Sequence, residues 1–122
     1  MGRYEYDRPA RILDARGGAR RVRLAVARSP WRRFLGLMGL AGAPDGCGLL
    51  LEACGSIHMM FMRFPIDVVW LGRPEASRAR TVVGVSRNVR PWRVAFGPRG
   101  ARSCIEMAAG TAPEHPCAVE ME

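Results

Sequence analysis

The most apolar stretch of the chain, residues 57–71, is interrupted in its middle by the dipeptide Phe64-Pro65. A proline has no amide hydrogen to donate within a helix, and it disfavours the helical conformation for the residue before it. The stretch therefore predicts two strands, over residues 57–63 and 66–71, which meet at a bend or a bulge.

Further short strands are predicted on both sides of this stretch. Alternating apolar residues over 21–28, β-branched residues over 81–89 and a second alternation over 102–107 are typical of strands. One short helix is predicted over residues 30–38, because a serine and a proline open it and apolar side chains follow at helical spacing. We therefore predict a mainly β fold, a β-sandwich or jelly-roll-like single domain with one short helix, and no parallel pairing of strands.

The length and the ends of the chain set its organisation. A chain of 122 residues can bury one core but hardly a second. Residues 1–9 are polar and lack an apolar pattern, which predicts a flexible N-terminal arm before a single β-rich domain over residues 10–122. No stretch reaches the roughly 18 consecutive apolar residues that a membrane span needs. The charged start also lacks the apolar core of a signal peptide, so we expect a cytoplasmic protein without a membrane partner.

All 19 basic residues are arginine, and the formal net charge is +8. The arginines concentrate in residues 1–33 and 73–103, which flank a nearly neutral, apolar middle. Such a surplus is compatible with nucleic-acid binding, but the complete absence of lysine fits a GC-rich coding sequence equally well. No known RNA-binding motif accompanies the charge. We therefore favour a small molecule or a peptide as the partner over a nucleic acid.

The cysteines Cys47, Cys54, Cys104 and Cys117 do not follow the spacing of metal ligands. Neither a Cys-x-x-Cys pair nor a His-x-x-x-His pair, the usual elements of zinc sites, is present. We expect reduced thiols, no disulfide, no bound metal and no cofactor.

The strand predicted over residues 57–63 places His58, Met60 and Met62 on one face. An imidazole and two thioethers could hold Cu(I), but methionines more often fill gaps in a core, and we prefer that interpretation. Asp67 stands at the entrance of a buried strand, where a carboxylate must find a partner. Backbone amides at the bend or a side chain such as Arg63 could provide that partner, so a structural role and a ligand-binding role both stay open.

Several motifs occur in a characteristic order along the chain. They are Arg33-Phe34-Leu35-Gly36-Leu37-Met38, Gly48-Leu49-Leu50-Leu51, Ile57-His58, Met62-Arg63-Phe64-Pro65-Ile66-Asp67-Val68-Val69, Pro91-Trp92-Arg93 and Ile105-Glu106-Met107-Ala108-Ala109-Gly110-Thr111. In this order they resemble the prokaryotic family known as domain of unknown function 192, over roughly residues 20–112. The resemblance implies a compact, β-rich, jelly-roll-like domain, and it implies no activity.

The motif positions can be brought into one neighbourhood around a hollow. An arginine of the helix could meet a carboxylate, and the tryptophan at a strand corner could form a wall beside the imidazole. Glu106, a single acid in an apolar run, is expected either to pair with an arginine or to face solvent by alternation, and alternation is the simpler account. We predict a ligand-binding site made of Arg33, His58, Met62, Arg63, Asp67 and Trp92.

Three functions fit such a site. The favoured one is a non-catalytic binding module that holds a small molecule, a peptide or a sugar in a concave site. The second is a hydrolase-like enzyme with His58 as base and Asp67 as orienting carboxylate, although no nucleophile-elbow motif is present. The third is a nucleic-acid-associated protein that uses its arginine-rich segments. The residues favour the first over an enzyme and do not determine the oligomeric state.

Overall fold

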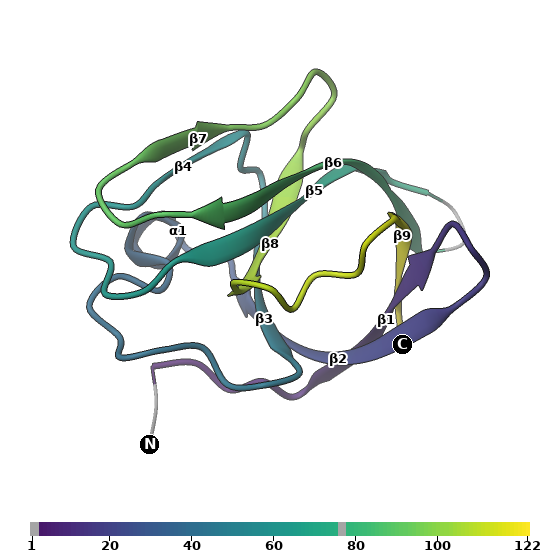
Figure 1. Ribbon diagram of the computed structural model, residues 1–122, viewed down its shortest axis with the longest axis horizontal. Helices are drawn as coiled ribbons and strands as arrows, with labels where there is room; N and C mark the ends of the chain where they lie inside the picture. The colour runs from purple at the N-terminus through teal and green to yellow at the C-terminus, as the bar shows by residue number, and fades with distance from the viewer. Residues whose placement is uncertain (1–2, 76–77) are drawn as a thin grey trace.

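The computed structural model describes residues 3–75 and 78–122, which form nine strands and one short helix (Figure 1). Seven strands form a closed barrel in the order β1-β2-β3-β8-β5-β6-β9, and β4 pairs with β7 in a separate two-stranded sheet. The bounds are β1 Arg8–Asp14, β2 Ala19–Ala27, α1 Pro30–Leu35, β3 Cys47–Leu51, β4 Ser56–His58, β5 Ile66–Pro74, β6 Ala79–Val89, β7 Val94–Phe96, β8 Ser103–Ala108 and β9 Pro116–Met121. The prediction of a mainly β fold is confirmed.

The barrel closes because its last strand is paired on both sides. Val119 of β9 lies opposite Ile12 of β1 and also opposite Arg80 of β6, and both pairings are antiparallel. Each barrel strand therefore has two neighbours, whereas a sandwich leaves open edges on two sheets. The prediction of a sandwich or jelly roll is wrong, because short strands with turn signals fit an open or a closed arrangement equally well.

One pair of barrel strands is parallel. Ala25 of β2 lies opposite Leu49 of β3, and the crossover over residues 28–46 carries α1. A parallel connection needs about a dozen residues, which this segment provides. The prediction that no strands pair in parallel is therefore wrong.

The described part of the predicted N-terminal arm lies against the segment that follows α1. Tyr4 is buried, and its hydroxyl donates to the carbonyl oxygen of Gly36 at 2.7 Å. Strand β1 already begins at Arg8. Residues 3–7, which precede the first strand, thus contact the segment after α1 through Tyr4. Residues 1–2 of the predicted arm lie outside the described residues.

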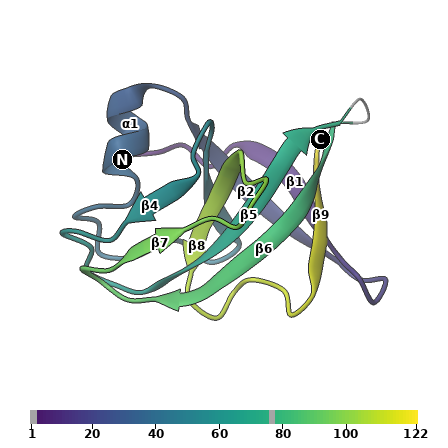
Figure 2. The same ribbon diagram turned by 90° about the horizontal axis from the view of Figure 1, so that it is seen from above.

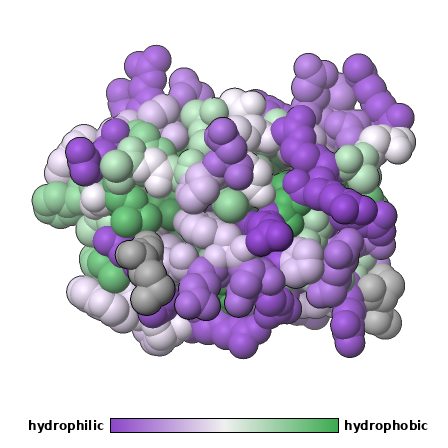
Figure 3. Space-filling view, turned by 90° about the horizontal axis from the view of Figure 1, so that it is seen from below, coloured by the Kyte–Doolittle hydropathy of each residue, from purple (hydrophilic) through white to green (hydrophobic). Residues whose placement is uncertain are grey.

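The helix is shorter than predicted. The Ser29 side chain accepts from the amide of Arg32, and the helix ends at Leu35 because Gly36 takes a positive φ of 49°. Trp31 is 66% exposed and Phe34 55% exposed, so the helical spacing does not mark a buried face. Figure 2 shows α1, β4 and β7 together at one end of the molecule, and Figure 3 shows apolar residues gathered at that end.

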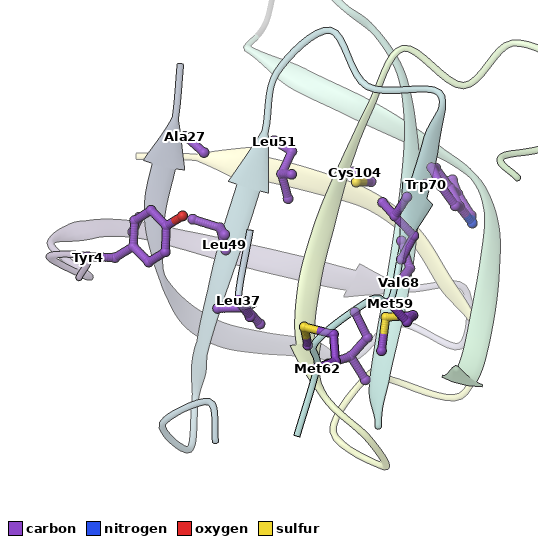
Figure 4. Close-up of a cluster of buried hydrophobic side chains, with 13 residues drawn as sticks. Tyr4, Ala27, Leu37, Leu49, Leu51, Met59, Met62, Val68, Trp70 and Cys104 are labelled. Carbon is purple, nitrogen blue, oxygen red and sulfur yellow. The ribbon is translucent and has the colours of Figure 1, made fainter. Parts of the chain in front are cut away.

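Two apolar clusters pack on opposite sides of the barrel wall. The inner cluster fills the barrel and includes Ile105 of β8, whereas its neighbour Cys104 belongs to the outer cluster. The outer cluster includes Leu37 from the segment after α1 and Ile57 of β4, and Ala95 of β7 packs against it. Figure 4 shows side chains of this cluster, among them Leu49, Leu51, Val68 and Trp70. Strand β8 is therefore buried on both faces. No helix in the described part of the chain has the length and the hydropathy that crossing a bilayer requires.

Candidate functional site

A narrow cavity of about 40 Å³ lies between the end of α1 and strand β4, above the outer face of β8. Three of the six predicted site residues line it, namely Arg33, His58 and Met62. Three further polar residues, Cys54, Ser56 and Glu106, also line it. The chain therefore brings groups from four separated segments to one small opening.

Glu106 is the most buried polar group of this cavity. It is 4% exposed, and its Oε1 atom is buried without a hydrogen-bond partner among the described residues. Burial, followed by the nearby Cys54 thiol, raises the pKa of the carboxyl to about 8, although the amide of Leu37 donates to it. The carboxyl is thus mainly protonated at neutral pH. Its predicted exposure is wrong, because α1 and the following residues cover this face of β8.

Gly36 allows the backbone after α1 to approach this carboxyl. A Cβ atom at this position would stand 3.0 Å from Glu106 Oε1, and the φ of 49° is itself unfavourable for residues with a side chain. The glycine of the motif is therefore required both by the turn and by the carboxyl beneath it.

The Cys54 thiol forms another wall of the cavity and is paired with a second thiol below the wall. Cys54 is half-buried, and Cys104 lies beneath it in the outer cluster. The hydrogen bond from Cys104 is the main reason that the pKa of Cys54 is lowered to about 7, and the same contact raises the pKa of Cys104. Cys54 therefore carries a substantial thiolate fraction at neutral pH, next to a carboxyl that is mainly neutral.

Both ring nitrogens of His58 are occupied. Nε2 lies 3.0 Å from the carbonyl oxygen of Phe34, and Nδ1 accepts from the amide of Met60 at 3.3 Å. A neutral ring with its proton on Nε2 satisfies both contacts. His58 thus connects β4 to α1, and in this arrangement neither nitrogen is available as a general base.

Asp67 lies in a different hydrogen-bond network. The side chain is 1% exposed and accepts from the amides of Asn88 and Gly110, each at 2.9 Å, and of Ala112 at 3.1 Å. Three backbone donors compensate the burial of the carboxylate. Of the two roles considered for Asp67, the structural one accounts for all of these contacts, and no catalytic pair with His58 is formed.

The other two predicted residues lie outside the cavity. Trp92 is 59% exposed, and its ring meets that of Phe61 edge to face at 4.9 Å. Arg63 is exposed and does not line the cavity. The structure thus brings Arg33, His58 and Met62 together and leaves Arg63, Asp67 and Trp92 apart from them. The signal for the missed Glu106 was its isolation in an apolar run.

A larger hollow, of about 670 Å³, lies between the N-terminal segment, β2 and α1. It is open, and the hydroxyl of Tyr4, which lines it, is already hydrogen-bonded. No group of three His, Cys, Asp or Glu side chains within residues 3–75 and 78–122 could hold a metal ion. The cavity above Glu106 is therefore the stronger candidate site.

The comparison with protein families gives a match over nearly the whole described fold. The sequence profile of DUF192, described as an uncharacterized ACR, matches residues 11–122. The chain belongs to the DUF192 family. Gly36, Glu106 and all the cavity residues lie within the match, so the resemblance predicted from the motifs is confirmed.

Solved structures resemble this DUF192 chain in fold. A putative transcription regulator from Sinorhizobium meliloti is 18% identical with a TM-score of 0.82, and 98% of each chain is covered. A protein of unknown function from Novosphingobium aromaticivorans is also 18% identical, with a TM-score of 0.74, and the match covers 92% of this chain and 83% of that one. Among curated proteins no match was found. At this identity the likeness shows the fold alone.

Proposed function

We propose that this DUF192 protein is a non-catalytic binding module that takes a small, uncharged hydrogen-bonding group into the cavity above Glu106. The group is a hydroxyl or a primary amide of a small molecule, a peptide or a sugar. The observation that carries the proposal is the buried Oε1 atom of Glu106, which has no partner among the described residues. A buried polar atom left unpaired costs about 1–3 kcal/mol, so a ligand that bonds to it is favoured by a similar amount.

The size of the cavity limits what can enter. About 40 Å³ accommodates only two or three water-sized groups, so the end of a ligand enters and its body stays outside. The rings of Phe34 and His58, whose centroids are 5.1 Å apart, stand at the rim. Aromatic faces beside a polar pocket suit the apolar face of a sugar or the plane of an amide.

The charges around the cavity favour an uncharged group. Arg33 and the thiolate form of Cys54 on the wall carry opposite charges whose effects on a charged ligand oppose each other, so neither sign of ligand charge is favoured by both. The protonated carboxyl of Glu106 can both donate and accept, as can a hydroxyl or an amide. The occupied nitrogens of His58 give no support to a hydrolytic role.

A thermal-shift screen tests this proposal. Neutral polyols, monosaccharides and primary amides are added to the wild type, to Glu106→Gln and to Glu106→Leu at about pH 6.5. We expect stabilising ligands to act on the wild type and on Glu106→Gln, which keeps the hydrogen bonds, and to lose their effect on Glu106→Leu. Equal stabilisation of Glu106→Leu would place the binding elsewhere, and no stabilisation by any compound would mean that only solvent fills the cavity.

A further inference from the structure

The exposed large apolar side chains of the protein gather at one end. Among the described residues all of them lie in α1, in the segment after β4, or in and just before β7. We define the aromatic face by the rings of Trp31, Phe34, Phe61, Trp92 and Phe96, which are 55–75% exposed. Scattered exposed apolar residues are ordinary on a soluble protein, but a concentration of rings at one end is typical of an interaction surface.

The same segments carry positive charge and no negative charge. Residues 29–35, 56–65 and 90–102 contain seven arginines and neither aspartate nor glutamate. Six of these arginines are exposed and Arg33 is half-buried. Within the described part of the chain, residues 3–75 and 78–122, none of these seven arginines forms an ion pair. The aromatic face therefore complements an anionic partner.

The rings present their surfaces outward. Trp31 stacks on Phe34 with centroids 5.9 Å apart and planes 22° apart, and Phe61 meets Trp92 edge to face. Peptides are usually recognised by grooves that receive their anchors, whereas these side chains protrude. An interfacial membrane anchor also combines aromatic rings with arginines, as those adjoining Trp31, Phe34 and Trp92 in the sequence, so vesicle binding is the competing outcome of the test below.

We propose that the aromatic face binds single-stranded nucleic acid, with bases stacked on the exposed rings and phosphates on the surrounding arginines. Every base has a flat surface on which an aromatic side chain can stack. A single strand alternates bases with phosphates, and the aromatic face likewise places arginine guanidinium groups next to its rings. The proposal does not depend on the cavity above Glu106, although Phe34 belongs to both.

Fluorescence anisotropy with labelled oligothymidine of about 12 nucleotides tests this at about 50 mM salt. We expect Trp31→Ala and Trp92→Ala each to weaken binding at least about fivefold, since stacking is lost. Arg93→Ala should lower the slope of log affinity against log salt by about one. Arg16→Ala is the matched control, because Arg16 is equally exposed but lies in the β1–β2 turn at the other end of the molecule (Figure 1).

Thermal melting shows whether each variant remains folded, which we expect because the side chains removed are exposed. Binding by the folded wild type, with loss in the tryptophan variants and none in Arg16→Ala, supports the proposal. It is overturned if oligothymidine does not bind, or if Arg16→Ala weakens binding as much as Arg93→Ala while the tryptophan variants bind normally. Binding of phosphatidylserine vesicles or polyglutamate without binding of oligothymidine also overturns it.

Discussion

Replacement of Glu106 with glutamine should change how the stability of the protein responds to pH. The pKa of this carboxyl rises from 4.5 in the unfolded chain to about 8 in the folded protein, mainly because of burial. The folded state therefore keeps its proton at pH values where the unfolded state has lost it. The stabilising contribution is fully present below the unfolded pKa and is lost as pH rises through the folded pKa.

The size of the effect follows from the two pKa values. The full difference corresponds to roughly 5 kcal/mol, and between about pH 5 and about pH 9 the wild type should lose roughly 4 kcal/mol of unfolding free energy through this group. Glutamine cannot titrate, so Glu106→Gln should lack this loss. Its advantage over the wild type should therefore grow with pH.

Urea denaturation at a series of pH values measures this difference. Both proteins are compared in a Cys54→Ser background, because the Cys54 thiol titrates in the same range and faces the same cavity. This substitution removes the smaller cause of the raised Glu106 pKa and leaves burial, the larger one, so the loss in this background should be smaller than in the wild type. All other titrating groups are common to the two proteins and cancel. Parallel curves of unfolding free energy against pH for the two proteins would refute the argument that Glu106 is held protonated by burial.

Three further predictions follow from single contacts. Asp67→Ala should destabilise the protein by roughly 3–5 kcal/mol in urea denaturation, because three buried amides lose their acceptor; a loss below about 1 kcal/mol would contradict this. Gly36→Ala should cost at least about 1–2 kcal/mol through its positive φ, and a double variant with Glu106→Ala should recover only the steric part; equal stability of Gly36→Ala and the wild type would contradict the close approach. Alkylation of Cys54 by iodoacetamide, followed by mass spectrometry, should show a rate midpoint near pH 7. Cys47, whose pKa is raised by burial, should react at a higher pH. Identical profiles for the two cysteines would contradict the argument that the contact with Cys104 lowers the pKa of Cys54.

Local patterns in the sequence were sufficient where a neighbour in the chain decides the structure. Strand β5 begins at Ile66, directly after the proline at position 65, as predicted. The strand predicted over residues 57–63 is wrong beyond His58, because β4 ends there and an irregular segment leads to the proline. The need of Asp67 for partners was also evident from its apolar surroundings. Which donors serve it was not, because Gly110 and Ala112 follow more than forty residues later.

Features that depend on distant segments could not be predicted from periodicity. Alternation places Glu106 on the opposite face of β8 from Ile105, which is correct, but it cannot tell that α1 covers that face. Barrel closure likewise depends on the pairing of Ile12 with Val119, at opposite ends of the chain. These long-range contacts decide both the architecture and the chemistry of the cavity.

The position of β9 between β1 and β6 has a consequence for biosynthesis. Strands β1 and β6 are synthesised before β9, so during translation they lack the strand that joins them. Their two edges stay unpaired until β9 has left the ribosome, and such edges invite association with other chains. Chaperone demand during synthesis should therefore be set by the arrival of the last strand rather than by the early hairpin.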